Sequence, residues 1–284
     1  MDASTSTRKK FIDLEQIIRS KNPRLLKLMP AFLLNYIRRV IHEKDVNAFI
    51  DRHGHKYDFD FVHAIIEEFG AKVEHRGLEN IPEKGGFILA SNHPLGGLDA
   101  MALLHAISAR RTDVRFIVND ILLQLENLKG LFTGVNKHGR NSARMLDEIE
   151  ELYSSGKGTL IFPAGLVSRK QHGLIRDLEW KKSFITRARK HQKNVVPVYI
   201  EGQNTQRFYN LALWRKRLGI KANLEMFFLV DEMYRQKNKT ITIIFGEQLP
   251  YQIFDKRFTD QQWADKVKEH VYALASDHKA RLAV

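Results

Sequence analysis

The sequence contains no cysteine among its 284 residues. Disulfide bonds, thiolate metal sites and covalent catalysis through sulfur are therefore excluded. A chain without cysteine is most easily reconciled with a reducing compartment, so we expect a protein of the cell interior.

Long apolar runs are also missing. The N-terminus reads Met-Asp-Ala-Ser-Thr-Ser-Thr-Arg-Lys-Lys, and no apolar stretch behind it could serve as the core of a signal peptide. The nearest apolar run, residues 32–37, is much shorter than the roughly 18 to 20 residues that span a bilayer. We therefore expect a cytoplasmic protein whose membrane contact, at the inner face of the cytoplasmic membrane, is peripheral.

Positive charge is abundant and concentrated. The net charge is +13, and residues 105–224 hold 22 Lys or Arg against 10 Asp or Glu. A surface tuned only for solubility does not require that concentration, so the pattern favours an electropositive face. Its partner could be anionic lipid, an acidic carrier protein, a phosphorylated substrate or nucleic acid, because screened attraction does not distinguish among them.

From residue 86 onward, short apolar runs rich in β-formers alternate with longer amphipathic segments. This alternation predicts an α/β fold with a mostly parallel central sheet flanked by helices, in a domain spanning residues 76–284. The expected strands are residues 86–90, 114–118, 158–162, 195–200 and 240–245. The expected helices are residues 100–110, 141–154 and 177–191, and Thr259 with Gln262 makes a capping box before a last helix.

Residues 1–75 are helical in pattern and lack strand signals, which predicts an N-terminal helical cap. Pro30 is well placed as the first residue of a helix that runs through Arg39. Apolar residues recur along this segment at helical spacing. The stripe is either a face packed on the core or a face that lies in the membrane interface.

The most unusual segment follows the first of the expected strands and reads Ser91-Asn92-His93-Pro94-Leu95-Gly96-Gly97-Leu98-Asp99. Its proline and paired glycines favour a tight turn that could return the Asp99 carboxylate to the His93 imidazole. A carboxylate on one ring nitrogen leaves the other free to accept a proton from a hydroxyl group. The alternative is that Asp99 is only a helix N-cap and His93 an ordinary histidine.

Three further segments follow this one in order. They are Gly134-Val135-Asn136-Lys137 with Arg140 and Arg144, then residues 162–169, Phe-Pro-Ala-Gly-Leu-Val-Ser-Arg, and Val196-Pro197-Val198. Over residues 75–250 the four segments resemble the blocks of the lysophospholipid acyltransferase superfamily, which includes 1-acylglycerol-3-phosphate acyltransferases. The form Asn-His-Pro-x-Gly-x-x-Asp resembles the branch with hemolysin-like and amino-acid-lipid O-acyltransferases.

The chain departs from the family pattern in three places. Five residues, instead of four, separate His93 from Asp99, so the turn must differ locally for the two side chains to meet. Lys137 replaces an arginine, which keeps the charge but loses bidentate phosphate binding. Ala164 replaces a glutamate that organises the acceptor pocket. The last change disfavours lysophosphatidate as the acceptor more than it disfavours acyl transfer.

The resemblance implies an O-acyltransferase of lipid biosynthesis. It would move a fatty acyl group from a thioester of acyl carrier protein or coenzyme A to the hydroxyl of a membrane lysolipid, either an amino-acid-containing lysolipid or lysophosphatidate. His93 and Asp99 would be catalytic, and the thioester would be a co-substrate, with no cofactor and no metal. The substrate-binding candidates are Asn92, Lys137, Arg140, Phe162, Pro163, Gly165, Ser168, Arg169 and Pro197.

Two other functions use the same residues differently. A thioester hydrolase would direct His93 at water, and a non-enzymatic basic module would bind membrane or nucleic acid without using His93. The basic residues are not interleaved with aromatics, and helix–turn–helix and zinc motifs are missing from the sequence. We therefore expect the partners to be the acyl donor, the lysolipid and an anionic membrane surface, and not nucleic acid.

Overall fold

The computed structural model describes residues 10–119, 122–123, 125–135, 143–221 and 223–283. A seven-stranded sheet lies at its centre, in the order β1-β9-β8-β2-β5-β3-β4. All neighbouring strands pair in parallel except β8 and β9, which are antiparallel. The predicted α/β class with a mostly parallel sheet is confirmed. The strands are β1 (Lys72–Arg76), β2 (Phe87–Ser91), β3 (Val114–Asn119), β4 (Phe132–Val135), β5 (Gly158–Ile161), β8 (Val195–Ile200) and β9 (Thr240–Phe245).

The five predicted strands are those with continuous apolar runs, and each forms within one residue of its expected bounds. The structure adds β1 and β4 at the two edges of the sheet. Neither has a continuous apolar run, because β1 is mostly charged and β4 contains Gly134. A separate antiparallel hairpin, β6 (Arg169–Gln171) and β7 (Leu174–Arg176), was not predicted either.

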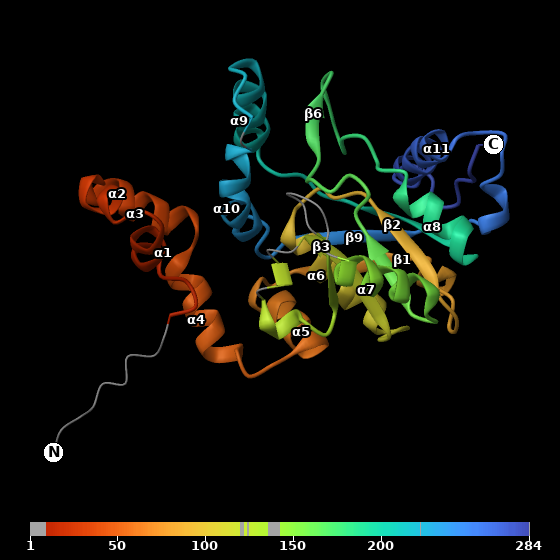
Figure 1. Ribbon diagram of the computed structural model, residues 1–284, viewed down its shortest axis with the longest axis horizontal. Coiled ribbons are helices and arrows are strands. Elements are labelled where there is room, and N and C mark those ends of the chain that lie inside the picture. The colour runs from red at the N-terminus through yellow and green to blue at the C-terminus, as the bar shows by residue number, and fades with distance from the viewer. Residues whose placement is uncertain (1–9, 120–121, 124, 136–142, 222, 284) are drawn as a thin grey trace.

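Helices cover both faces of the sheet (Figure 1). On one face, α5 (Asp58–Glu68) and α6 (Gly97–Ser108) pack in the larger apolar core. On the other, α7 (Ala143–Ser154), α8 (Ser183–His191) and α11 (Asp260–Ala273) surround a second core. The predicted capping box at the start of α11 is present. The helix expected over residues 177–191 begins only at Ser183, and Trp180 donates a hydrogen bond to Asp177 in the segment before it.

The N-terminal helices extend to one side of the sheet (Figure 1). They are α1 (Leu14–Lys21), α2 (Pro23–Leu28), α3 (Ala31–Val40) and α4 (Glu43–His53). The expected boundary between residues 75 and 76 falls inside β1, which pairs with β9. Helix α5 also belongs to the main core, through Phe61 and Val62. The α/β unit therefore includes α5, and α4, which contributes Phe49 to the same core, connects it to the helical extension formed by α1–α3.

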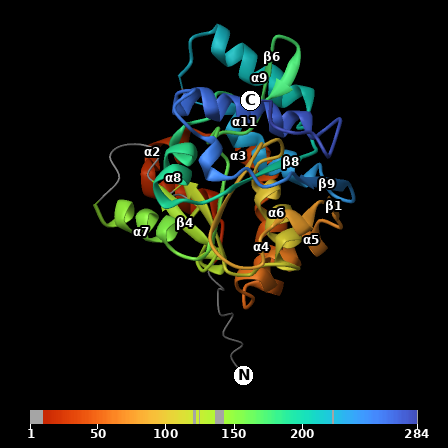
Figure 2. The same cartoon turned by 90° about the vertical axis from the view of Figure 1, so that its right-hand side faces the viewer.

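A second projection stands at the upper edge of the molecule in Figures 1 and 2, where α9 (Gln206–Arg217) lies beside the β6–β7 hairpin. It is completed by η4 (Leu224–Phe228) and α10 (Leu229–Tyr234), and the remaining 3-10 turns are η1 (Leu78–Asn80), η3 (Glu126–Leu128) and η5 (Tyr251–Ile253). Within the described residues, we find no helix with the length and apolar content needed to cross a bilayer.

The place of α5 in the core can be tested by comparing two Phe→Ala substitutions. Phe61 is buried in the core, so Phe61→Ala should lower the free energy of unfolding by about 3–5 kcal/mol. The loss should appear in urea unfolding followed by the fluorescence of Trp180 and Trp263, which are buried across the sheet. Phe32→Ala on α3 is the control, because Phe32 is 75% exposed. Separate transitions for α5 and the sheet would contradict this fold.

Candidate active site

The turn between β2 and α6 carries the predicted pair. Strand β2 is fully buried and ends at Ser91, and Pro94 then prevents it from continuing as a ladder. Gly96 adopts φ 92° and ψ −132°, a conformation open essentially only to glycine. The chain reverses there and enters α6 at Gly97, which places Asp99 in the first helical turn.

His93 and Asp99 meet across this turn. The Nδ1 atom of His93 lies 2.9 Å from Oδ2 of Asp99. The same oxygen accepts hydrogen bonds from the backbone N–H groups of Leu95 (2.8 Å) and Gly96 (3.0 Å). The turn thus accommodates the fifth intervening residue, and the two side chains remain in contact. Asp99 also caps α6. The two interpretations of Asp99, as a partner of His93 and as a helix cap, are therefore compatible.

The Asp99 carboxylate is fully buried, and burial raises the pKa of Asp99. Hydrogen bonds from His93 and from the two backbone N–H groups oppose that increase in pKa. The second oxygen, Oδ1, is buried without a hydrogen-bond partner among the described residues. Because Nδ1 faces the carboxylate, Nε2 is the ring nitrogen left to accept a proton.

The imidazole is further oriented by Phe162, which follows β5. The two rings are stacked, with centroids 3.9 Å apart and planes 13° apart. The His93 side chain keeps 17% of its surface exposed, so it remains accessible while its plane is fixed. Phe162, predicted at the substrate site, therefore lies against the candidate base.

Asp177 holds the backbone around His93 and was not found by the sequence analysis. Its Oδ1 atom accepts from the N–H of His93 (3.2 Å) and from the Ser168 hydroxyl (2.6 Å), and its Oδ2 accepts from Nε1 of Trp180 (2.9 Å). The Ser168 N–H in turn donates to the His93 carbonyl at 2.8 Å. Asp177 carries no motif of its own, and the sequence predicted it as the first residue of a helix.

Three predicted substrate contacts are used inside the protein instead. The Asn92 amide donates to the Ile200 carbonyl (2.8 Å) and accepts from the Ile200 N–H (2.7 Å), which joins the ends of β2 and β8. Ser168 is bound as described above, and Arg169 pairs with buried Glu225 at 2.9 Å. All three are buried and bonded within the protein, so we expect them to position the site.

The other substrate-binding candidates differ in position. Pro163 is buried, whereas Gly165 is exposed, with φ 64° at the loop after β5. The Gly165 N–H donates to the Phe162 carbonyl at 2.9 Å and is therefore not free to stabilise an oxyanion. Pro197 is buried in β8 beside Ala90, in the interior of the sheet. Lys137 and Arg140 lie outside the described residues.

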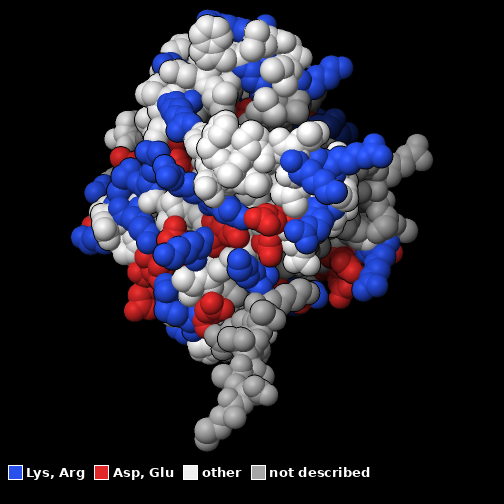
Figure 3. Space-filling view, turned by 90° about the vertical axis from the view of Figure 1, so that its left-hand side faces the viewer, with Lys and Arg blue, Asp and Glu red and all other residues white. Residues whose placement is uncertain are grey.

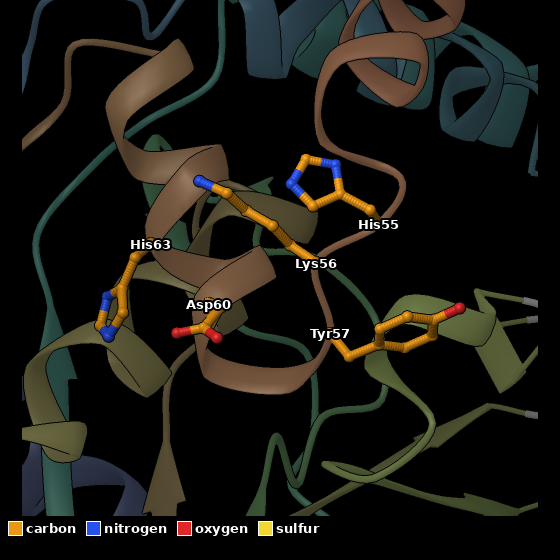
Figure 4. A pocket seen from close by; sticks show the side chains of 5 residues that line it. All are labelled: His55, Lys56, Tyr57, Asp60 and His63. Carbon is orange, nitrogen blue, oxygen red and sulfur yellow. The ribbon is translucent and has the colours of Figure 1, made fainter.

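A shallow pocket near the start of α5 is a separate feature (Figure 4). Its lining residues are His55, Lys56, Tyr57, Asp60 and His63. Figure 4 shows that Tyr57 and Asp60 point in different directions, so the side chains do not converge on one ligand position. Across the described ranges, no group of three or more His, Asp or Glu side chains could hold a metal ion.

A parallel α/β sheet with an oriented His–Asp pair at the end of a central strand defines a protein that can activate a hydroxyl group by base catalysis. The chain matches the family described as Acyltransferase over residues 16–279. It therefore belongs to the acyltransferase family, and the relatives below identify it as an O-acyltransferase.

Two relatives carry the same name. A lyso-glycine lipid O-acyltransferase of Bacteroides thetaiotaomicron is 42% identical over 266 residues, covering 93% of this chain and 97% of that protein. A lyso-glycine lipid O-acyltransferase of Phocaeicola vulgatus is 42% identical over 265 residues, covering 93% and 95%. The solved structure of a 1-acyl-sn-glycerophosphate acyltransferase from Thermotoga maritima aligns over 95% of this chain and 98% of that chain, with 18% identity and a TM-score of 0.47.

Because the Asp99 carboxylate is buried, Asp99→Asn should have opposite effects on stability and activity. Asp99→Asn can keep both backbone hydrogen bonds but loses the charge that stabilises an imidazolium, so turnover should fall about 10²-fold or more. The raised pKa of Asp99 means that folding takes up a proton, and stability is lost as pH rises from about 4 through the folded pKa. The variant, which cannot ionise, should therefore gain stability relative to the parent over that range. Urea unfolding of both proteins at pH 4 and pH 7 measures the difference between their free energies of unfolding. A variant that loses stability relative to the parent between pH 4 and pH 7 would refute the raised pKa of Asp99.

The assignment of Asn92 as a positioning residue is also testable. Asn92→Ala should lower the free energy of unfolding by about 2–3 kcal/mol, because two buried backbone groups of Ile200 lose their partners. Asn80→Ala, which removes a single bond to the Phe245 carbonyl, should cost less. An Asn92→Ala protein of parental stability with a higher KM for the acceptor would restore the substrate-binding interpretation.

Proposed function

We propose that this O-acyltransferase transfers a fatty acyl group from an acyl thioester to the hydroxyl of a membrane lysolipid. The observation that carries the proposal is the contact between His93 and Asp99, which orients an accessible imidazole on a buried carboxylate. The names of the two relatives that are 42% identical support a lysolipid as the acceptor.

In the proposed reaction, Nε2 of His93 removes the proton from the lysolipid hydroxyl as its oxygen attacks the thioester carbonyl. The new C–O bond forms a tetrahedral oxyanion, and Asp99 stabilises the imidazolium through Nδ1. When the C–S bond breaks, the imidazolium returns the proton to the leaving thiolate. No acyl-enzyme is formed, which suits a chain without cysteine.

The oxyanion requires hydrogen-bond donors. The N–H groups of Leu95, Gly96, Asp99 and Gly165 are already bonded. We therefore assign this role to the N–H groups of Gly97 and Leu98, the first two residues of α6. The N-terminus of a helix carries partial positive charge and unpaired N–H groups, and both favour an oxyanion.

We propose an amino-acid-containing lysolipid as the acceptor. Ala164 lies where the family pattern has a glutamate, and its side chain packs in the apolar cluster with Trp180 and Phe184. That corner of the site lacks the carboxylate that organises a glycerol-phosphate acceptor in the family. Lys137 and Arg140 remain proposed contacts for the anionic headgroup.

The acyl donor in this proposal is a thioester of acyl carrier protein or coenzyme A, and no further cofactor is required. We also propose peripheral contact with the anionic inner face of the cytoplasmic membrane. Supporting this, Figure 3 shows an uncharged area flanked by Lys and Arg on the face where α1–α3 lie. Leu28 and Phe32 are among the exposed apolar side chains of those helices.

The proposal is tested by His93→Ala in the purified full chain. With labelled acyl thioester and a panel of lysolipids resolved by mass, the variant should lose about 10³-fold or more of the transfer rate. His55→Ala, in the pocket of Figure 4, is the control and should match the parent.

The panel also separates the alternatives. Parental transfer by His93→Ala would disprove the mechanism. Thioester consumption without an acylated lipid would indicate a hydrolase, and acylated lysophosphatidate as the main product would contradict the acceptor inferred from Ala164.

A further inference from the structure

The segment from the end of α9 through η4 exposes an unusual group of apolar side chains. Trp214 is 60% exposed and Leu218 is 69% exposed. Ile220, Leu224 and Phe227 of the same segment are exposed as well. Large apolar side chains gathered on the surface of a soluble protein commonly mark a site of interaction with a partner or a membrane.

The same segment is strongly basic. Arg215, Lys216, Arg217 and Lys221 lie among the apolar residues, and Glu225 is the only acidic residue between positions 206 and 228. Glu225 is fully buried and pairs with Arg215 (2.7 Å) and Arg169 (2.9 Å). The charges of Lys216, Arg217 and Lys221, which are exposed, therefore remain on the surface. The exposed face of this segment is therefore both apolar and cationic.

The segment also occupies an extreme position. Helix α9 projects away from the sheet in two perpendicular views (Figures 1 and 2). Beside it stands the β6–β7 hairpin, where Leu174 is another exposed apolar residue. At the base of α9, the Asn204 amide donates to the Pro94 carbonyl at 3.1 Å, next to His93. The projection is thus anchored beside the catalytic turn.

We propose that the α9–η4 segment docks on the surface of an anionic bilayer. Trp214 and the neighbouring leucines would enter the interface, where amphipathic aromatic rings are favoured, while Lys216, Arg217 and Lys221 bind lipid phosphates. An acidic carrier protein would match the charge but not the protruding apolar residues. A second copy of this chain would be repelled by the same positive charge.

Buried contacts connect this docking segment to the catalytic turn. Glu225 of η4 holds Arg169, and the neighbouring Ser168 donates its N–H to the His93 carbonyl. Docking through α9 would thereby hold His93 at a fixed distance from the surface that supplies the acceptor. This role in catalysis rests on the proposed function, whereas the docking itself does not.

Intrinsic fluorescence offers a direct test, because the chain has three tryptophans and two of them, Trp180 and Trp263, are fully buried. Vesicles containing phosphatidylglycerol should shift the Trp214 emission to shorter wavelength, and brominated lipid should quench it. Phosphatidylcholine vesicles alone should produce a smaller change. The Trp214→Ala protein should show neither the shift nor the quenching.

Vesicle sedimentation measures the affinity of the protein for the anionic vesicles. Trp214→Ala/Leu218→Ala should weaken partitioning about tenfold or more, because the anchoring apolar area is lost. The control Tyr57→Ala removes a similarly exposed ring, at 58%, and should bind as the parent does. Lys216→Gln/Lys221→Gln should weaken binding by about fivefold for each charge. The charge-matched control Lys84→Gln/Lys256→Gln, at exposed positions elsewhere, should have little effect.

Three outcomes would overturn the docking proposal. They are an unchanged Trp214 spectrum with anionic vesicles, parental partitioning of Trp214→Ala/Leu218→Ala, and a Trp214 response to acyl carrier protein in place of vesicles. His93→Ala should bind vesicles as the parent does. Vesicle binding therefore tests docking even if the proposed function is wrong, and the transfer assay tests the proposed function even if docking is wrong.

Discussion

The buried carboxylate of Asp99 organises the centre of this enzyme through a single oxygen. That oxygen accepts hydrogen bonds from the N–H groups of Leu95 and Gly96, which closes the turn after β2, and it contacts Nδ1 of His93, which orients the proposed base. The same carboxylate lies in the first turn of α6, where negative charge is favoured. Its other oxygen lacks a partner within the described residues, so some of the cost of burial is uncompensated. The buried carboxylate therefore lowers stability at the place where it orients the proposed base.

The turn that carries His93 is held by contacts from several elements. Asp177 binds the His93 N–H, and Tyr272 of α11 accepts a hydrogen bond from the Asp177 N–H at 2.7 Å. Helix α10 also packs against the turn. Its Leu229 side chain is so close that a Cβ atom at Gly96 would lie 3.5 Å from it. Helices from both faces of the sheet therefore converge on one short loop.

The helical extension contacts the His93 turn indirectly, through α10. His42, between α3 and α4, stacks on Tyr234 of α10 with ring centroids 3.9 Å apart, and its Nε2 lies 3.2 Å from Asp231. Since α10 also packs against the Gly96 turn, the N-terminal helices are mechanically connected to the site. The two surfaces proposed to meet the membrane, α1–α3 and α9–η4, are both connected to the His93 turn by short series of contacts.

The sequence by itself determined the parts that depend on local patterns. Apolar runs predicted five strands, and the structure confirms all five. The turn-forming residues Pro94 and Gly96 indicated that His93 and Asp99 could meet, as they do. The edge strands β1 and β4 carried no such run and were missed. Only the tertiary structure decided what Asn92, Arg169 and Asp177 do. Their partners Ile200, Glu225 and His93 are distant in sequence, and hydrogen bonds between remote segments leave no periodic signal in the chain.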